Sequence, residues 1–209
     1  MAAFPDRTQA GRRLAGYLSH HHDHDPLVLG IPRGGVVLAA EVAGALDGDF
    51  GVVIARKIRA PFSSELAIGA VAPDGVPMLD DLMVQRLGLT EEAVAEATAA
   101  AHEEVRARQA RYPDVDSRIE GRVVIVVDDG VATGSTLRAA LGYVKRRGAA
   151  FVSCAVPVGP PRTIDLIATE VDEIVCPLQP DRFRAVGEWY DDFGQVTDAE
   201  VEELLRARA

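Results

Sequence analysis

The amino-acid sequence predicts an α/β fold in which a mainly parallel, twisted sheet is flanked by helices. Short apolar runs rich in β-branched residues alternate along the chain with segments of helical periodicity. Parallel strands need such crossover segments between them, because a tight turn can join only antiparallel strands. We interpret five runs as core strands: 27–31, 50–58, 123–127, 151–158 and 173–177.

The segments between these runs carry helix signals. Asp6 is a plausible N-cap of a first helix, and Thr90 is followed by two glutamates, as is typical of a helix start. Gly148 follows a basic last turn and marks a helix end. We expect the later helices at these places: 36–46, 90 to about 112, 137–147, 162–169 and 198–206.

Length and composition restrict the class of protein. The chain has 209 residues, 48% of them hydrophobic, which suffices for one α/β domain with a large core. Its formal net charge of −10 argues against a nucleic-acid partner, because phosphate backbones require basic surfaces. No apolar run approaches the ~18 residues of a membrane-spanning helix, and the first residues lack the apolar core of a secretion signal.

The two cysteines, Cys154 and Cys176, both lie in apolar, strand-like runs. A disulfide framework is therefore not expected, and a reducing cytoplasm is the predicted location.

The stretch 123–136 carries the densest chemical signal. A buried strand leads into Asp128 and Asp129, and a loop of glycine and hydroxyl residues follows, 130–136. A helical pattern begins at Leu137, so this loop should present free N–H groups at a helix N-terminus, which favour a phosphate monoester. The carboxylates repel phosphate but suit sugar hydroxyls, or a Mg²⁺ ion shared with those hydroxyls. A ribose 5-phosphate satisfies both halves of this stretch.

Two further motifs offer positive charge. Arg33 precedes Gly34 and Gly35 at a predicted strand–helix junction, where the glycines let backbone N–H groups approach an anion. Arg56 and Lys57 stand where another apolar run ends. In a parallel sheet, ligands bind at the carboxyl ends of the strands, where all three motifs are expected.

The residues 123–136 resemble the phosphoribosyl pyrophosphate (PRPP) signature of type I phosphoribosyltransferases. Four apolar positions, an acidic pair, three residues and Thr-Gly-Ser-Thr reproduce its pattern. The loop at Arg33 is similar to the family's pyrophosphate loop, and Arg56-Lys57 looks like a basic pair of its adenine and orotate members. The whole pattern also resembles a bacterial group of predicted phosphoribosyltransferases.

The resemblance implies a fold, a donor substrate and a set of site residues. The fold is a type I phosphoribosyltransferase-like sheet with a hood. The implied catalytic residues are Asp128, Asp129, Arg33 and Lys57, and Mg²⁺ is expected to act mainly through PRPP, near the acid pair. The implied PRPP-binding residues are Arg33, Gly34, Gly35, Arg56, Lys57, Asp128, Asp129, Ala132, Thr133, Gly134, Ser135 and Thr136.

One position departs from part of the family. Members that act on 6-oxopurines carry an aspartate just before the Thr-Gly of the phosphate loop, whereas this chain has Ala132. The acceptor base is therefore left open, as purine or pyrimidine-like.

We expect one domain over residues 1–209, with a core at about 25–177. A helical insertion at about 76–115 and an aromatic cap at about 178–209 are the candidates for the hood. Trp189 and Tyr190 of the cap are predicted to stack on the base, although packing onto the sheet would also explain these aromatic rings.

The leading functional hypothesis is a Mg²⁺-dependent transferase that moves the 5-phosphoribosyl group from PRPP to a nitrogenous base and releases pyrophosphate, in nucleotide salvage. The alternative is a non-catalytic regulator that binds PRPP or a nucleotide on the same fold. A phosphosugar hydrolase would need a poised nucleophile, which we do not find. The alanine-rich stripe of the insertion indicates packing on a neighbour, so we expect a homo-oligomer, such as a dimer.

A run of histidine and aspartate residues, 19–25, also invites a metal-site interpretation. No second cluster of ligands is evident near it in the sequence, so we interpret the run as a solvated connection between a helix and a strand.

Overall fold

The computed structural model describes residues 2–113, 115 and 118–207. Five parallel strands form the central sheet in the order β2-β1-β6-β7-β8. Their bounds are β1 Leu27–Gly30, β2 Asp49–Val52, β6 Val123–Val127, β7 Phe151–Ala155 and β8 Glu173–Val175. The predicted α/β class with a mainly parallel sheet is confirmed.

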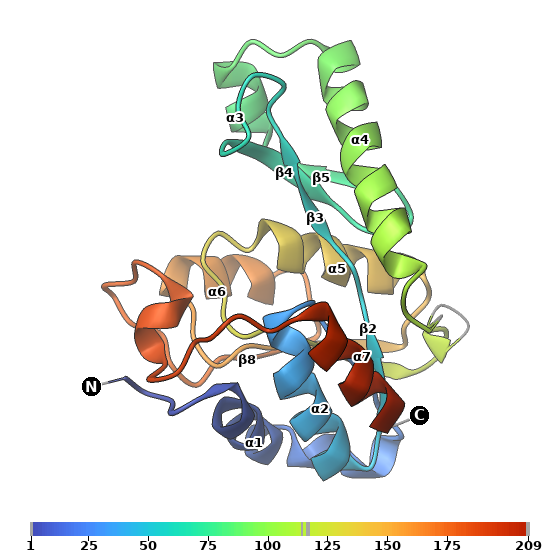
Figure 1. Cartoon of the computed structure of the whole chain (residues 1–209), viewed down its shortest axis with the longest axis vertical. Helices are drawn as coiled ribbons and strands as arrows, with labels where there is room; N and C mark the ends of the chain where they lie inside the picture. Colours follow the sequence, from blue (N-terminus) through green and yellow to red (C-terminus); the bar gives the residue numbers. More distant parts are fainter. Residues whose placement is uncertain (1, 114, 116–117, 208–209) are drawn as a thin grey trace.

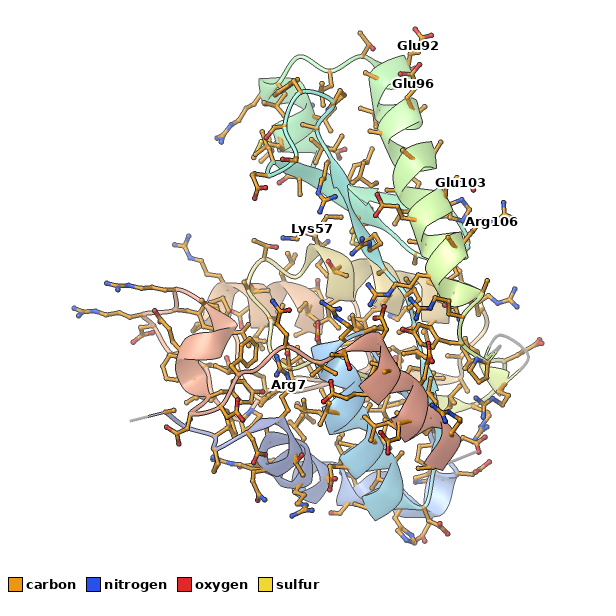
Figure 2. The ribbon with its side chains drawn as sticks, in the orientation of Figure 1. Arg7, Lys57, Glu92, Glu96, Glu103 and Arg106 are labelled. Atoms are coloured by element: carbon orange, nitrogen blue, oxygen red, sulfur yellow. The ribbon has the colours of Figure 1, made fainter. Side chains whose placement is uncertain are left out.

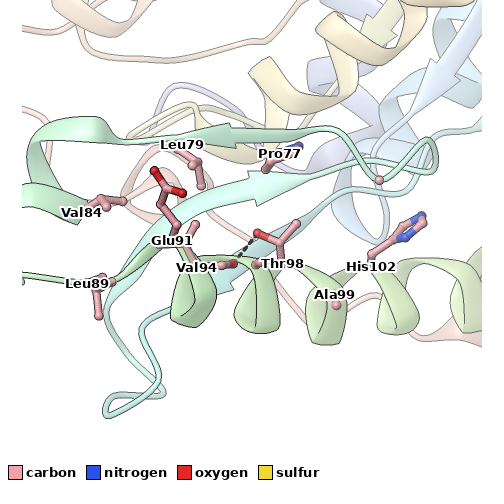
Figure 3. Close-up of a pocket in the computed structure, with 11 residues that line it drawn as sticks. Pro77, Leu79, Val84, Leu89, Glu91, Val94, Thr98, Ala99 and His102 are labelled. Carbon is pink, nitrogen blue, oxygen red and sulfur yellow. Dashed lines mark hydrogen bonds between the residues drawn. The ribbon is translucent and has the colours of Figure 1, made fainter.

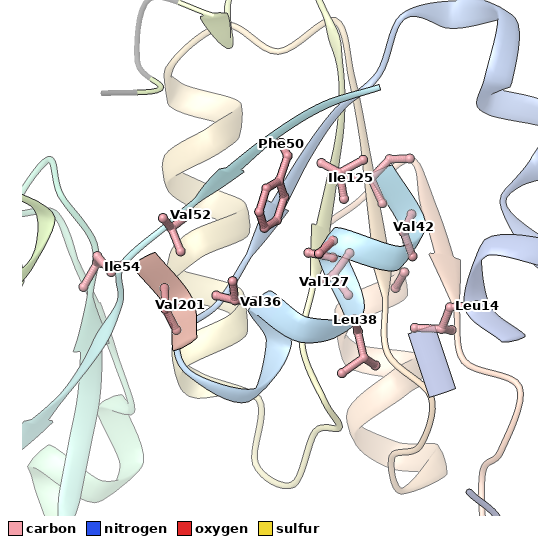
Figure 4. Close-up of a cluster of buried hydrophobic side chains, with 14 of the residues drawn as sticks. Leu14, Val36, Leu38, Val42, Phe50, Val52, Ile54, Ile125, Val127 and Val201 are labelled. Carbon is pink, nitrogen blue, oxygen red and sulfur yellow. The ribbon is translucent and has the colours of Figure 1, made fainter. Parts of the chain in front are cut away.

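Helices cover both faces of this sheet (Figure 1). α1 (Arg7–Tyr17), α2 (Gly34–Leu46) and α7 (Asp198–Ala207) share one face, and α5 (Ser135–Arg146) and α6 (Pro161–Ala168) share the other. The strand pattern explains this division, because neighbouring side chains of a strand point to opposite faces. Figure 4 shows Ile125 and Val127 of β6 beside Val36 of α2, whereas Val124 and Val126 belong to the core under α5.

A second, antiparallel sheet stands beside this body, in the order β3-β4-β5. It consists of β3 (Arg56–Arg59), β4 (Ala67–Val71) and β5 (Pro77–Leu79). With α3 (Asp81–Arg86) and α4 (Glu91–Gln109) it forms the upper part of the molecule in Figure 1, which we call the hood module. The predicted insertion thus packs with two strands that precede it in the chain.

The single strand predicted at 50–58 is wrong. The chain forms β2 in the central sheet, leaves it over 53–55, and continues as β3 in the hood module. The apolar run continues through the break because Val53 and Ile54 are buried, so hydrophobicity does not mark the change of sheet.

The C-terminal segment returns to the body. After β8 it forms the short 3₁₀ helix η3 (Val186–Trp189), and Phe4 and Tyr190 form a β-bridge that joins the N-terminal segment to it. None of the helices in the described part of the chain has the length and apolar character needed to cross a membrane.

Candidate active site

Two loops meet because their strands are neighbours. β1 and β6 are paired so that Gly30 lies beside Val127, and the chain continues from these residues into the Arg33 loop and the acid pair. The two segments approach closely. A Cβ atom added at Gly34 would lie 1.8 Å from Oδ2 of Asp129, and one at Gly35 would lie 2.6 Å from the backbone oxygen of Val127. Gly35 is therefore required by the close approach of α2 to the backbone at 127–128, whereas a side chain at Gly34 would displace the carboxylate of Asp129.

A cavity of about 520 Å³ opens at this edge of the sheet. It brings together three stretches that are far apart in the sequence, and its predicted lining residues are Arg33, Gly34, Arg56, Lys57, Asp128, Asp129 and Thr136. Figure 2 labels Lys57 on the hood module and Arg7 on the body, and both side chains line this cavity. Gly35, Ala132, Thr133, Gly134 and Ser135 lie outside its lining.

The two carboxylates of the acid pair are partly buried and line the cavity. Asp128 accepts a hydrogen bond from the backbone N–H of Asp129 over 2.8 Å. Burial, together with the negative charge of Asp129, raises the pKa of Asp128 well above the ordinary value of an aspartate. Burial also raises the pKa of Asp129, although the guanidinium of Arg7 opposes that shift.

Arg7, in the first turn of α1, is a site residue that sequence reasoning missed. Its Nε donates to Oδ2 of Asp129 over 2.8 Å, and its Nη1 donates to the backbone oxygen of Gly194 over 2.7 Å. Its guanidinium carbon lies 3.9 Å from the ring centroid of Phe193, within cation–π distance. Arg7 therefore joins the acid pair to the C-terminal segment.

The loop 130–136, predicted to bind a phosphate, leads into α5 two residues earlier than expected. Gly134 takes a left-handed conformation, with φ of 81°, directly before α5, and no side chain caps this helix. The Oγ atoms of Thr133 and Ser135 lie 3.3 Å apart, and Thr163 donates to the backbone oxygen of Ala132 over 2.8 Å. The uncapped helix N-terminus and its hydroxyl groups form a site suited to a phosphate.

Basic side chains predominate around the cavity. Arg59 of the hood module joins Arg7, Arg33, Arg56 and Lys57 in its lining, which also contains the two aspartates. Nη2 of Arg56 lies 2.9 Å from Oε2 of Glu104, and Nη1 of Arg33 lies 4.0 Å from Oδ1 of Asp198. This excess of positive charge suits a ligand with several negative charges.

The two aromatic residues predicted to stack on the base do not line the cavity. Tyr190 is buried with its ring centroid 5.5 Å from that of Phe4, and its hydroxyl donates to the backbone oxygen of Asp129 over 2.6 Å. Trp189 packs against the same core. The C-terminal segment contributes Val186 and Phe193 to the lining instead, so the base contact of Trp189 and Tyr190 stays a prediction without support from their position.

The acid pair provides the oxygen ligands that Mg²⁺ prefers. The two carboxylates are partly buried, which disfavours their charge, and only Asp129 forms an ion pair with Arg7. The donor atoms and the local charge therefore fit a divalent cation that arrives with an anionic ligand.

A second cavity, of about 570 Å³, lies within the hood module between β5, α3 and α4 (Figure 3). Its lining is mostly apolar, and His102 at one end has Nε2 2.9 Å from the backbone oxygen of Pro73. Its lining contains none of the predicted PRPP-binding residues.

The fold and the site define an α/β protein with a cavity at the carboxyl edge of a parallel sheet, lined mainly by basic side chains and an acid pair. A family model, the phosphoribosyl transferase domain, matches residues 2–191. The chain therefore belongs to the phosphoribosyl transferase family, which confirms the resemblance seen in its motifs.

Individual proteins agree with this assignment. "Putative phosphoribosyl transferase Rv0571c" of Mycobacterium tuberculosis (strain ATCC 25618 / H37Rv) is 40% identical over 207 residues. The match covers 98% of this chain and 47% of that protein, so the chain spans about half the length of the curated relatives it matches. The crystal structure of TT1426 from Thermus thermophilus superposes with a TM-score of 0.81 at 39% identity, over 99% of each chain.

Proposed function

We propose that this protein transfers the 5-phosphoribosyl group from PRPP to a nitrogenous base, with Mg²⁺, and releases pyrophosphate. One observation carries the proposal: a single cavity gathers the Arg33 loop, the Arg56-Lys57 pair and the Asp128-Asp129 pair, at the edge where α5 begins. PRPP has a phosphate at one end, hydroxyls in the middle and a diphosphate at the other, and these groups match the three kinds of side chain.

Each group has a role in the displacement at C1 of ribose. The phosphate loop at the start of α5 holds the 5-phosphate, and the acid pair accepts hydrogen bonds from the ribose hydroxyls. Arg33, Arg56 and Lys57 meet the negative charge that develops on the leaving pyrophosphate, where fixed cations act best in a site closed to water. The protein thereby fixes both ends of the donor, which is the main requirement for a reaction that needs no covalent intermediate.

When bound, Mg²⁺ supplies positive charge that neutralises the pyrophosphate as it leaves. Asp128 and Asp129 would hold such an ion through their carboxylate oxygens. Val186 and Phe193 line the side of the cavity contributed by the C-terminal segment, and we place the acceptor base against them.

The two free cysteines support the expected cytoplasmic location.

A non-catalytic PRPP or nucleotide sensor is the second candidate, and the Arg7–Asp129 ion pair favours it. Arg7 already supplies Asp129 with a cationic partner, so this carboxylate is neutralised without Mg²⁺. The two side chains are only 12% and 16% exposed. A sensor would bind PRPP in the same cavity and release no pyrophosphate.

A panel of purine and pyrimidine bases tests this proposal. The protein is incubated with PRPP, Mg²⁺ and each base in turn, and pyrophosphate release is measured. Base-dependent release supports a transferase, whereas tight PRPP binding without release with any base supports a sensor.

An Arg33 variant tests which end of PRPP this side chain binds. Arg33→Ala should weaken PRPP binding by at least tenfold and ribose 5-phosphate binding by less than threefold, because only PRPP presents the diphosphate. Calorimetry with both ligands measures this, and Arg182→Ala, exposed and outside the cavity lining, is the control. Equal losses for the two ligands would remove Arg33 from the pyrophosphate end.

A further inference from the structure

The histidine run and the last strand of the sheet come together at the end of the sheet opposite the cavity. The run forms the 3₁₀ helix η1 (Ser19–His24), and Glu173 is the first residue of β8. The predicted solvated connection is therefore wrong in part, because His21 is only 5% exposed and packs with its ring 5.6 Å from that of Phe151.

Two imidazoles face the carboxylate of Glu173. Nε2 of His20 lies 2.8 Å from its Oε1, and Nε2 of His21 lies 2.7 Å from its Oε2. These three ligand atoms lie within 4.8 Å of one another. In a tetrahedral zinc site with bonds of about 2.1 Å, ligand atoms stand about 3.4 Å apart, so small side-chain movements suffice to admit an ion.

The surroundings prepare the carboxylate for a cation. Ser153, fully buried on β7, donates its hydroxyl to Oε2 of Glu173 over 2.6 Å and so fixes its orientation.

We propose that His20, His21 and Glu173 form a binding site for a divalent transition metal of the Zn²⁺ class. Two imidazole nitrogens and one carboxylate oxygen are the donor set that such ions share, with a fourth position left for water. His20 is 54% exposed at its side chain and provides the entrance, whereas His21 is buried behind it. The ion joins η1 to the edge strand β8, two elements that lie about 150 residues apart in the sequence.

The same contacts also occur if the two imidazoles only donate hydrogen bonds to Glu173. Metal binding distinguishes these cases, because a hydrogen-bonded cluster without affinity for zinc takes up none at equimolar concentration. The measurement is made on the full chain, without an affinity tag and after treatment with a chelator. Zn²⁺ is titrated against a chromogenic competitor, and thermal unfolding is recorded with and without one equivalent of Zn²⁺.

We expect one Zn²⁺ bound per chain and a rise in Tm on binding. His20→Ala and Glu173→Gln should each weaken Zn²⁺ binding by at least tenfold and remove the rise in Tm. His22→Ala and His24→Ala are the matched controls, because both histidines are exposed in the same run and lie outside the cluster. Excess Mg²⁺ should not displace Zn²⁺, because Mg²⁺ prefers oxygen ligands.

Two outcomes overturn the proposal: no Zn²⁺ uptake at equimolar concentration, or uptake that His20→Ala and the control variants reduce equally. The exposed position of His20 makes its variant decisive even where Glu173→Gln fails to fold. None of these measurements depends on transferase activity, so the result is independent of the proposed function.

Discussion

At the scale of single residues, burial of the Asp128 carboxyl links the stability of the protein to pH. The raised pKa means that the folded protein holds this proton more tightly than the unfolded chain does. The resulting stabilisation is fully present below about pH 3.8, the ordinary value, and is lost as the pH rises through the raised pKa. Burial of the charged carboxylate therefore costs stability above this raised pKa, whereas the charged form is the stronger hydrogen-bond acceptor in the site.

Asp128→Asn should separate stability from binding. At pH 8 the variant is expected to unfold with a free energy about 1 to 2 kcal/mol higher than the parent, because a buried charge is removed. The difference should shrink towards pH 4, where the parent aspartate is protonated. Urea denaturation at the two pH values measures it, and a variant less stable than the parent at pH 8 contradicts the assigned burial cost.

Gly34→Ala tests the approach of α2 to the acid pair. The added Cβ would meet the end of the Asp129 side chain, which can move, so the fold should survive with a loss below ~1 kcal/mol. PRPP affinity should fall at least tenfold, because the carboxylate and Arg7 are displaced together. Gly16→Ala in α1 is the control, with open space around the added atom, and it should keep full affinity. Unchanged PRPP affinity in Gly34→Ala would show that the position of Asp129 is not critical.

Local patterns in the sequence predicted the residues that act within one motif. The glycines at 34 and 35, the acid pair and the hydroxyl loop each follow a strand end, and Gly34, Asp128, Asp129 and Thr136 line the cavity, whereas Gly35 and residues 132–135 do not. Arg7 could not be found this way, because its partner Asp129 is 122 residues away and the sequence of α1 does not distinguish Arg7 from the exposed Arg12 and Arg13. The partnership of the histidine run with Glu173 was missed for the same reason.

At the scale of elements, α7 attaches to the end of α4, where the hood module meets the body. Asp198, the first residue of α7, accepts hydrogen bonds from Arg108 over 2.8 Å and from Arg111 over 2.9 Å. Glu202, one turn later, pairs with Arg111 at 2.9 Å. The same Asp198 stands 4.0 Å from Arg33, so this network reaches from the hood module to the cavity.

Asp198→Ala should loosen that junction. Surface ion pairs contribute little to global stability, so we expect a loss below ~1 kcal/mol, but faster amide exchange in the last turns of α4. Hydrogen–deuterium exchange with peptide resolution measures the effect, and Glu203→Ala, exposed on the same helix, is the control. Equal exchange in α4 of Asp198→Ala and the control would exclude α7 as a support of the hood module.

Helix starts could be predicted from the sequence where a capping residue is present. Asp6 and Thr90 each accept a backbone hydrogen bond at their helix start, as predicted. The run 50–58 has no such signal. Its apolar character continues through Val53 and Ile54, and which sheet each half joins depends on partners far away in the sequence.

At the scale of the whole molecule, the alternation of strands and helices predicted the parallel sheet but could not give its strand order. The order places β1 and β6 side by side. This pairing brings together two loops of the site that lie almost 100 residues apart in the sequence. The acidic chain nevertheless concentrates basic side chains at one cavity, so its net charge of −10 describes the outer surface and not the site.

The most direct test of the account is the binding of PRPP to the parent protein and to the double variant Asp128→Asn, Asp129→Asn. Calorimetry in the presence of Mg²⁺ should give one PRPP per chain for the parent and no detectable binding for the variant, with circular dichroism showing the same fold for both. Equal affinity for PRPP in the two proteins would contradict the assignment of the acid pair to the ribose hydroxyls.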